Sequence, residues 1–493
     1  MKTYLAIDQG TTSSRAILFD QTGQICFTAQ QEFTQIFPHP GWVEHDPEEI
    51  WSSVLQVCEE VIAQAKKADM TISGIGITNQ RETTIIWDKI TGAPVHNAIV
   101  WQDRRTADIC QGLRQAGHED LVAARAGLVI DPYFSASKIS WILDNVEGAR
   151  QRAEAGELAF GTVESFLIWR LTKGANHISD ATNAARTSLM NIEDGCWDDD
   201  LCALFNVPQT ILPEITDCAG NLGLSEGVLS LNLPILSAIG DQQAAAVGQA
   251  CITPGSIKST YGTGCFVILN TGDQIIHSSN RLLSTVAWQL DGKRAFALEG
   301  SIFIAGAVVQ WLRDSMQLID SAQDSEKLAA DLQGNDGLFM VPAFTGLGAP
   351  WWNADARGAI YGLTRDTGPA QFARAALESV AYQTYDLFAA MAQDGMRPNR
   401  LRVDGGMAAN GWLMQFLSDI LDMPVDRPEI LETTALGAAM LAGLADGAYD
   451  SLEEMAQNWR LDSAFTPDLK SSTRQQLLAG WSEAVTKTRT QIA

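Results

Sequence analysis

The sequence of 493 residues has few basic side chains: its 34 lysines and arginines are outnumbered by 59 aspartates and glutamates, for a formal charge of −25. Such a field repels phosphate backbones, so we expect no nucleic acid partner. Long apolar runs are also missing. The N-terminal run covers only residues 4–7, and the small-residue run at 435–445 is far shorter than the ~20 residues of a membrane helix. These absences predict a cytoplasmic protein without a membrane partner.

Disulfide and metal-ligand patterns are absent as well. The eight cysteines are scattered and form no CxxC pair, which predicts reduced thiols. The six histidines show no HExxH or other ligand spacing, so we expect no zinc site held by side chains alone. Apolar residues make up 46% of the chain, as in globular proteins, and the length predicts two large or three smaller domains.

A weak internal repeat indicates how the chain is organised. Residues 4–25 have the pattern of a strand, a Gly-Thr turn, a second strand and a Thr-Gly hairpin turn, and residues 257–275 show the same order. We interpret the repeat as a duplicated domain; a chance match between two common hairpins is the alternative. Residues 72–78 and 83–87 have the pattern of strands, and apolar residues at 48–66 have the spacing of a helix. A second helix is predicted to begin at Gly368-Pro369. The pattern predicts an α/β fold with domains 1–250 and 251–493.

Residues 8–15, DQGTTSSR, form the first candidate phosphate loop. A strand brings Asp8 to its end, and Gly10 allows a tight turn whose backbone N–H groups can face an anion. Because Asp8 would repel phosphate, the loop also predicts a divalent cation, bound directly or through water. The other groups that would hold phosphate oxygens belong to Thr11, Thr12, Ser13 and Arg15. An ordinary polar β-turn is the alternative, and no Walker A loop occurs in the sequence.

Two more glycine turns follow apolar strands in the second half. The residues Gly262-Thr263-Gly264 would form the second loop. Residues 401–410 have the pattern of a strand, a Gly-Gly turn at 405–406 and Asn410 at the N-cap of a helix. Two glycines allow the backbone to approach a base or ribose, and the helix start offers free N–H groups to an anion. The alternative is an ordinary strand–turn–helix unit.

Eight stretches together resemble the FGGY carbohydrate kinases of the actin-like ATPase superfamily. They are DQGTTSSRA (8–16), TNQRETT (78–84), WQDRRT (101–106), GDQQAA (240–245), YGTGCF (261–266), EGSIFIAGAVVQWLRD (299–314), DGGMAAN (404–410) and TALGAAMLAG (434–443). Any one of them is weak, but eight in the family order are highly specific. The resemblance implies an α/β fold of two duplicated actin-like (ribonuclease H-like) domains with an ATP cleft between them. It also implies ATP and Mg²⁺ as cofactors, and a homodimer or homotetramer.

The resemblance further implies a reaction, the ATP-dependent phosphorylation of glycerol to sn-glycerol 3-phosphate, which is the entry step of glycerol catabolism. The stretch Gln80-Arg81-Glu82-Thr83 stands where the family's sugar kinases typically show Gln-x-His-Gly, and this favours glycerol over the alternative of another polyol or sugar. Asp241 would be the general base, and Asp8 would hold the metal through water. The substrate contacts carried over from the family are Arg81, Glu82, Trp101, Tyr133, Asp241 and Gln242. The nucleotide contacts carried over are Thr11, Thr12, Ser13, Arg15, Thr263, Gly306, Gln310, Gly406 and Asn410.

These residue types suit a small triol. Arg81 offers only donors, ionised Glu82 and Asp241 offer only acceptors, and Trp101 can cover the C–H edge. A site of this kind rejects analogues that lack a hydroxyl, because its buried polar groups would be left unpaired. Each residue also has an ordinary interpretation. Arg81 and Glu82 would then be a solvated ion pair, Asp241 a helix N-cap, and Trp101 and Tyr133 core aromatics.

Two other classes of function are kept as alternatives. A non-catalytic ATP-driven binding protein, such as a chaperone or a filament subunit, has no use for the NQRETT and GDQQ residues. A glycosidase would use Asp8 and Asp241 as paired carboxylates, which leaves the phosphate loops unexplained. One stretch departs from some bacterial relatives of the family. Residues 223–231 lack the arginine of their glycine-rich loop for a phosphorylated sugar effector, so we do not expect that feedback control.

Overall fold

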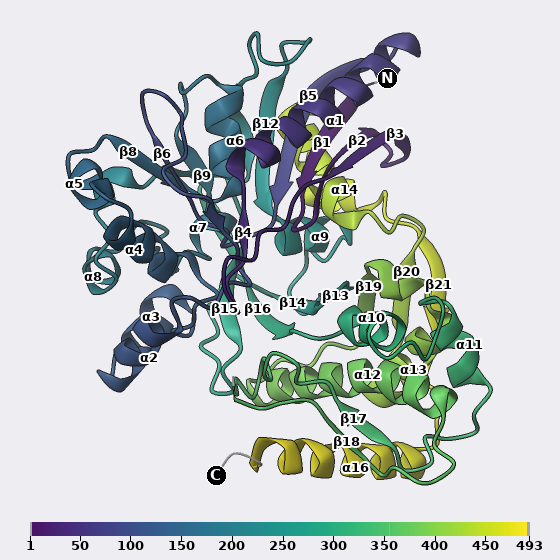
Figure 1. The fold of residues 1–493 in the computed structure, drawn as a ribbon. Helices are drawn as coiled ribbons and strands as arrows, with labels where there is room; N and C mark the ends of the chain where they lie inside the picture. The colour runs from purple at the N-terminus through teal and green to yellow at the C-terminus, as the bar shows by residue number, and fades with distance from the viewer. Residues whose placement is uncertain (1, 354, 491–493) are drawn as a thin grey trace.

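The computed structural model describes residues 2–353 and 355–490. Two large mixed β-sheets form the centres of two halves, which lie one above the other in Figure 1. The first sheet takes all its strands from residues 2–240, and the second takes all its strands from residues 257–465. Residues 249–256, which connect the halves, form neither helix nor strand. The protein is therefore α/β with two large sheets, and the sequence predicts this fold class.

Parallel strands form the centre of the first sheet. Its order is β11-β12-β5-β1-β2-β3, in which β12 and β1 both run parallel to β5, while the outer strands pair antiparallel. The strands are β1 (Lys2–Gln9), β2 (Ser13–Asp20), β3 (Ile25–Glu32), β5 (Thr71–Asn79), β11 (Ala219–Leu224) and β12 (Pro234–Gly240).

Both faces of this sheet are covered, because side chains alternate between the faces of a strand. On one face, Leu5 and Ile7 of β1 share an apolar core with helix α1 (Pro47–Lys67). On the other face, Tyr4 and Ala6 share a core with helix α14 (Thr433–Ala445). A strand that is covered on both faces is apolar throughout, and β1 is buried from Thr3 to its end.

The second sheet repeats the central pattern of the first. Its order is β15-β16-β14-β13-β19-β20-β21. In it β13 pairs antiparallel with β14 and parallel with β19, just as β1 pairs antiparallel with β2 and parallel with β5. The internal repeat predicted from the sequence is therefore confirmed. The strands are β13 (Ile257–Tyr261), β14 (Cys265–Gly272), β15 (Leu283–Leu290), β16 (Lys293–Ile302), β19 (Leu401–Asp404), β20 (Val425–Pro428) and β21 (Leu461–Phe465).

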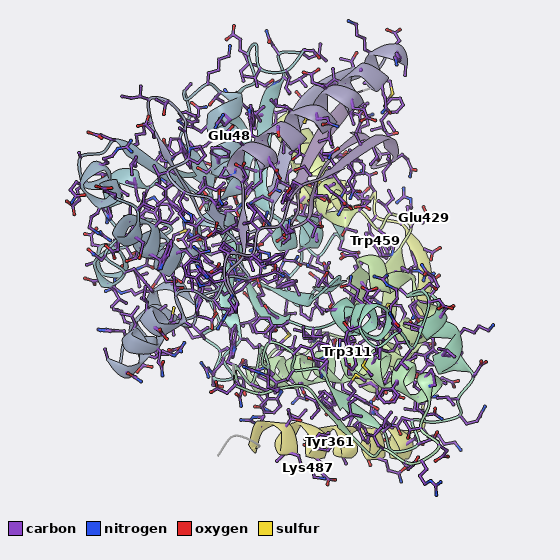
Figure 2. All side chains as sticks on the ribbon, in the orientation of Figure 1. Glu48, Trp311, Tyr361, Glu429, Trp459 and Lys487 are labelled. Carbon is purple, nitrogen blue, oxygen red and sulfur yellow. The ribbon has the colours of Figure 1, made fainter. Side chains whose placement is uncertain are left out.

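Short strands and helices surround the two large sheets, and Figure 2 adds the side chains to this ribbon. The short strands are β4 (Glu44–His45), β6 (Ile85–Asp88), β7 (Ala98–Ile99), β8 (Leu158–Gly161), β9 (Ile178–Asp180), β10 (Glu214–Thr216), β17 (Phe339–Val341) and β18 (Ala359–Tyr361). The remaining helices of the first half are α2 (Ala107–Gln115), α3 (Glu119–Ala126), α4 (Ser135–Asn145), α5 (Ala149–Glu154), α6 (Val163–Leu171), α7 (Ala181–Ala184), α8 (Asp199–Leu204) and α9 (Asp241–Gly248). Those of the second half are α10 (Gly306–Asp314), α11 (Asp324–Ala330), α12 (Pro369–Gln393), α13 (Gly411–Leu421), α15 (Leu452–Ala456) and α16 (Ser471–Thr490), with 3₁₀ turns at Gln209–Ile211 and Gly406–Ala409.

Helix α14 comes from the second half of the sequence but packs on the first sheet, beside β1 and β5 (Figure 1). Small residues allow the close approach. A Cβ on Gly437 would lie 1.9 Å from the carbonyl oxygen of Ala244 in α9. The apolar core of the first half is therefore completed by a segment far along the chain.

The predictions for two long helices agree with the structure. Helices α1 and α12 both begin with a proline and bury one apolar face, as their spacing predicts. All eight cysteines are free thiols. Within residues 2–353 and 355–490, no helix combines the length and apolar content that a membrane span needs.

Candidate active site

Three neighbouring parallel strands end at one edge of the first sheet and bring polar residues together there. Strands β1 and β12 both end opposite Asn79, the last residue of β5. Asp8, Arg81 and Asp241, which are far apart in the sequence, therefore meet at this edge. The carboxyl ends of parallel strands are the usual place for ligand binding in α/β folds.

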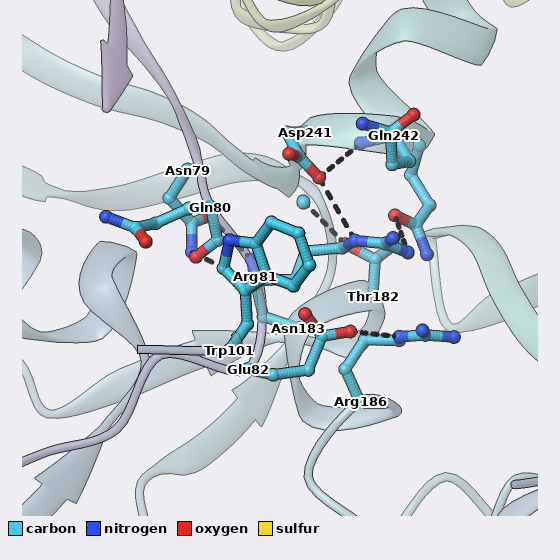
Figure 3. Close-up of polar contacts among 12 residues, drawn as sticks. Asn79, Gln80, Arg81, Glu82, Trp101, Thr182, Asn183, Arg186, Asp241 and Gln242 are labelled. Carbon is cyan, nitrogen blue, oxygen red and sulfur yellow. Dashed lines mark hydrogen bonds and ion pairs between the residues drawn. The ribbon is translucent and has the colours of Figure 1, made fainter. Parts of the chain in front are cut away.

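Arg81 is held by several acceptors at the centre of this edge. Its Nε lies 3.0 Å from Oδ1 of Asp241 (Figure 3). Its Nη1 and Nη2 donate to the two carboxylate oxygens of Glu299 at 2.6 and 2.9 Å, and Nη1 also donates to Gln243 at 3.3 Å. The side chains of Arg81 and Glu299 are 2% and 0% exposed, whereas that of Asp241 is 30% exposed. Asp241 is therefore the most accessible of these three side chains.

Glu82 is also buried, and it pairs with Arg186 rather than with Arg81. Nε of Arg186 donates to Oε1 of Glu82 at 2.6 Å (Figure 3), and Nη2 of Arg186 donates to Glu299 at 3.0 Å. Arg81, Glu299, Arg186 and Glu82 thus form a buried chain of alternating charge. The interpretation of Arg81 and Glu82 as a solvated ion pair is wrong.

The two carboxylates in this chain differ in their electrostatics. Burial raises the pKa of Glu82, and the guanidinium groups of Arg186 and Arg81 only partly offset it. Burial acts in the same direction on Glu299, but there the same two guanidinium groups outweigh it and hold the pKa below its ordinary value. Glu82 also has a φ of 60°, so the strand predicted at 83–87 begins only at Ile85.

Three aromatic rings lie next to these charges. The Nε1 of Trp101 donates to Oγ1 of Thr11 at 3.0 Å and so connects the first loop to the site. The ring of Trp101 meets Tyr133 edge-on at 5.7 Å and Phe266 at 5.8 Å between centroids. Tyr133 is a buried core residue, as its ordinary interpretation has it, and the guanidinium of Arg186 lies 5.5 Å from its ring centroid. Tyr133 is therefore both a core residue and a neighbour of the buried charged residues.

Asp241 occupies the first position of helix α9. The N-cap is Gly240, so the interpretation of Asp241 as the N-cap is wrong. The Asp241 carboxylate instead accepts the backbone N–H of Gln242 at 2.7 Å. The strand end that carries Asp241 is fixed by a bond of 2.9 Å from the N–H of Gly240 to the buried hydroxyl of Thr182 (Figure 3).

The first glycine loop turns tightly beside this edge. The N–H of Gly10 donates to the carbonyl of Ser13 at 3.0 Å, and the Ser13 hydroxyl accepts a bond from Gln30. Thr12 is exposed. Arg15 turns back so that its Nε lies 3.6 Å from the Asp8 carboxylate, and its Nη1 lies 2.5 Å from the carboxylate of Glu432.

Asp8 carries an unusual carboxyl group. Burial raises its pKa to about 6 against the lowering effect of Arg15, and the negative charges of Glu432 and Asp241 add to the rise. Oxygen ligands of like charge suit Mg²⁺. Within residues 2–353 and 355–490, no three His, Cys, Asp or Glu side chains gather as a metal site of their own. A metal ion here would therefore take its other ligands from phosphates and water.

The second half holds a pocket of about 390 Å³ beyond the carboxyl ends of β13 and β19. The sequence assigns five second-half residues to nucleotide binding, and all of them line this pocket: Thr263, Gly306, Gln310, Gly406 and Asn410. Asn410 is the N-cap of α13 and accepts the N–H of Leu413 at 2.8 Å, as predicted. A Cβ on Gly306 would lie 2.6 Å from the carbonyl oxygen of Gly262, so only glycine fits there.

Comparison with known proteins agrees with this geometry. The N-terminal domain of the FGGY family of carbohydrate kinases matches residues 3–248, and the C-terminal domain of that family matches residues 257–445. The chain belongs to the FGGY family of carbohydrate kinases. It is 58% identical over 488 residues to glycerol kinase 1 of Pseudomonas aeruginosa and 58% identical over 492 residues to the glycerol kinase of Ectopseudomonas mendocina. Each match covers 99% of both chains.

Solved structures of FGGY kinases also resemble the chain over its whole length. Plasmodium falciparum glycerol kinase with ADP is 38% identical, with a TM-score of 0.92 and coverage of 100% of this chain and 99% of that one. The gluconate kinase of Lactobacillus acidophilus is 22% identical, with a TM-score of 0.88 and 99% coverage of both chains, and this likeness shows the shared fold alone.

Three residues of the site were not predicted from the sequence. Phe266 and Glu299 lie inside stretches that carry the family resemblance, YGTGCF and EGSIFIAGAVVQWLRD. Glu299 follows the apolar run at 295–298, and a glutamate in such a position was a signal for a buried ion pair. Arg186 had no comparable signal, because its partners Glu82 and Glu299 are about 100 residues away in the sequence.

Proposed function

We propose that the enzyme transfers the γ-phosphoryl group of ATP to a terminal hydroxyl of glycerol, which gives sn-glycerol 3-phosphate and ADP. The observation that carries the proposal is the partly exposed Asp241, held by buried Arg81 at the sheet edge next to the first glycine loop. The curated relatives that are 58% identical over nearly the full chain bear the name glycerol kinase and support this substrate.

Asp241 acts as the general base in this reaction. The glycerol oxygen forms a bond to the γ-phosphorus, the bond from the γ-phosphorus to the bridging oxygen of ADP breaks, and the hydroxyl proton passes to the Asp241 carboxylate. A loose phosphoryl transition state asks mainly for orientation of the hydroxyl. The ion pair with Arg81 and the bond from the Gln242 N–H hold the carboxylate for this task.

Arg81 still has one donor for the substrate. Nη1 donates to Glu299 and Gln243, and Nη2 donates once to Glu299, while Nε lies 3.0 Å from Asp241 in an ion pair. The second N–H of Nη2 is left to bind a glycerol hydroxyl. Glu82 accepts from a hydroxyl, while Trp101 and Tyr133 cover the carbon frame. Glycerol is thus bound by donors and acceptors whose positions are already fixed.

ATP lies across the two halves in this proposal. Its base and ribose occupy the pocket at β13 and β19, and its phosphates reach the loop at residues 10–13. Asp8 would hold Mg²⁺ through water, and the ion supplies neutralising charge to the phosphates when bound. The residues of the chain that contact the nucleotide are Thr11, Thr12, Ser13, Arg15, Thr263, Gly306, Gln310, Gly406 and Asn410.

The proposal includes the setting of the enzyme. We assign domains 1–250 and 251–493 and a cytoplasmic location, as the sequence pattern predicts, and a homodimer or homotetramer, as the family resemblance implies. Sedimentation equilibrium should give two or four times the chain mass. A monomer at all concentrations would overturn the proposed oligomeric state and would leave the proposed reaction unaffected.

Coupled-assay turnover with MgATP tests the reaction. The panel consists of glycerol, dihydroxyacetone, xylulose and gluconate. We expect kcat/KM for glycerol to exceed the values for xylulose and gluconate by at least about 100-fold, because misfitting hydroxyls leave buried charges unpaired. Faster turnover of xylulose or gluconate would overturn the choice of substrate, and ADP release that glycerol does not accelerate would overturn the reaction.

A further inference from the structure

Lys258 is a buried charge with no role in the reaction described above. It belongs to β13 of the second half and is 0% exposed. Its ammonium donates to Oε1 of Gln242 at 2.5 Å and to Oγ1 of Thr260 at 2.8 Å. These two bonds are its polar contacts within the described part of the chain. The charged groups that act on it electrostatically belong to Asp404, Asp241, Arg81 and Glu299.

A lysine in this position does not stabilise the folded protein. A buried ammonium without a carboxylate partner loses its hydration, and two neutral acceptors return only part of that loss. Consistent with this, burial lowers the pKa of Lys258. An unbranched apolar side chain such as methionine would fill a similar volume without that cost. Lys258 is therefore expected to have a functional role, and its bond to Gln242 indicates which one.

The direction of that bond fixes the orientation of the Gln242 amide. An ammonium group can only donate, so Gln242 must turn its Oε1 toward Lys258. The amide Nε2 then points away from Lys258 as a donor. Among residues 2–353 and 355–490, no protein group pairs with this Nε2. With the lysine absent, either end of the amide could occupy the same place.

We propose that Lys258 is a positioning residue that makes Gln242 a hydrogen-bond donor to the polyol. The inference rests on the proposed function, because it takes Gln242 as a glycerol contact. The glycerol site then combines two acceptors, Glu82 and Asp241, with two donors, Arg81 and Gln242. Each hydroxyl of a triol both donates and accepts, so this balance favours polyols over substrates that present carbonyl or carboxylate oxygens.

The link also joins the two halves of the molecule. Gln242 belongs to α9 of the first half, whereas Lys258 comes from the first strand of the second half. The amide of Gln242 is therefore set only where β13 lies against α9. This makes the glycerol site dependent on a residue of the half that carries the nucleotide pocket.

A double-mutant cycle with Lys258→Met and Gln242→Ala tests the inference. Lys258→Met should raise the glycerol KM about 10-fold, the effect of roughly one hydrogen bond, and leave the ATP KM within about 2-fold. If the lysine acts through Gln242, adding Lys258→Met to Gln242→Ala should change the glycerol KM by less than about 2-fold. A further 10-fold rise in the double variant would overturn the inference.

Two more variants serve as controls. Thr260→Val removes the other acceptor of Lys258 and should leave the glycerol KM within about 2-fold of wild type. Gln242→Glu keeps an acceptor for Lys258 but has no donor, so its glycerol KM should rise about 10-fold while its urea midpoint does not fall. An unchanged KM in Gln242→Glu would contradict the donor role, even where Lys258→Met fails to fold. Wild-type enzyme that does not phosphorylate glycerol would instead overturn the proposed function.

Discussion

The proposed glycerol site and the proposed nucleotide site of this protein, called here the glycerol side and the nucleotide side, consist of different kinds of groups. On the glycerol side, Arg81, Glu82, Arg186 and Glu299 are at most 2% exposed and bind one another before any ligand arrives. The nucleotide side is a pocket of about 390 Å³ that is shaped by glycine turns and helix starts. In the proposed function, glycerol is recognised by buried charges and the nucleotide by the shape of the backbone.

The difference teaches where each kind of substitution should act. In a buried network of charges, removal of one member leaves its partners unpaired, so both binding and stability suffer. In a pocket bounded by backbone, an added methyl group forces the neighbouring turn to shift, and we expect that shift to act mainly on the ligand that the turn binds. The four predictions below test this contrast.

The largest effect is expected for Asp241→Asn. Loss of the base should lower kcat by about 10²–10⁴, while the affinity for ADP stays unchanged. Coupled-assay kinetics and calorimetric titration with ADP measure the two quantities separately. Turnover close to that of the wild type would remove Asp241 from the mechanism.

Arg81→Ala should damage the glycerol side alone. We expect the glycerol KM to rise about 100-fold and the free energy of unfolding to fall by roughly 3–5 kcal/mol, because Glu299 and Asp241 lose their partner. Urea denaturation and initial rates measure these changes. The matched control is Arg281→Ala, which breaks an ion pair between an arginine that is 48% exposed and Glu119, which is 33% exposed, and should hardly move the urea midpoint. Equal losses of ATP and glycerol binding in Arg81→Ala would contradict the separation of the two sides.

Gly306→Ala should damage the nucleotide side alone. Its Cβ would lie 2.6 Å from the carbonyl oxygen of Gly262, so the pocket must shift. We expect the ATP KM to rise about 10-fold and the glycerol KM to stay within about 2-fold. Gly112→Ala in helix α2 is the control, since no atom lies within 4 Å of its added Cβ. A larger change in the glycerol KM than in the ATP KM would refute the contrast.

The smallest effect concerns pH. Burial raises the Asp8 pKa from 3.8 to about 6, so the folded protein binds the proton more tightly than the unfolded chain does. The contribution of Asp8 to stability is therefore full below pH 3.8 and is lost as the pH rises to about 6. Asp8→Asn should remove this decline, which urea unfolding at pH 4.5 and pH 7 would show. An unchanged pH dependence in the variant would contradict the raised pKa.

Much of the fold could be predicted from local patterns. Helices α1 and α12 have an apolar face and begin with a proline, and the two hairpins contain glycine turns. The signal that identifies each of these elements therefore lies within about 20 residues of sequence. Helix α14 was different. Its run of small residues is apolar all round, so nothing in the sequence assigns it to the first sheet.

The site shows the same limit. Individual residues could be assigned from the family motifs, but their pairing could not. Arg81 and Glu299 are 218 positions apart, and only the fold brings them to 2.6 Å. The sequence pairs Arg81 with its neighbour Glu82, whereas the structure gives each a different partner. Contacts of this range depend on how the two halves pack, which no local spacing encodes.

The most direct test of the account is a crystal structure with glycerol and a non-hydrolysable ATP analogue. We predict a terminal oxygen of glycerol within about 2.6–3.2 Å of the Asp241 carboxylate. This oxygen should lie between the carboxylate and the γ-phosphorus. The purine should lie in the pocket beside Gly306 and Asn410. Glycerol bound away from Asp241, or a nucleotide outside that pocket, would contradict the account.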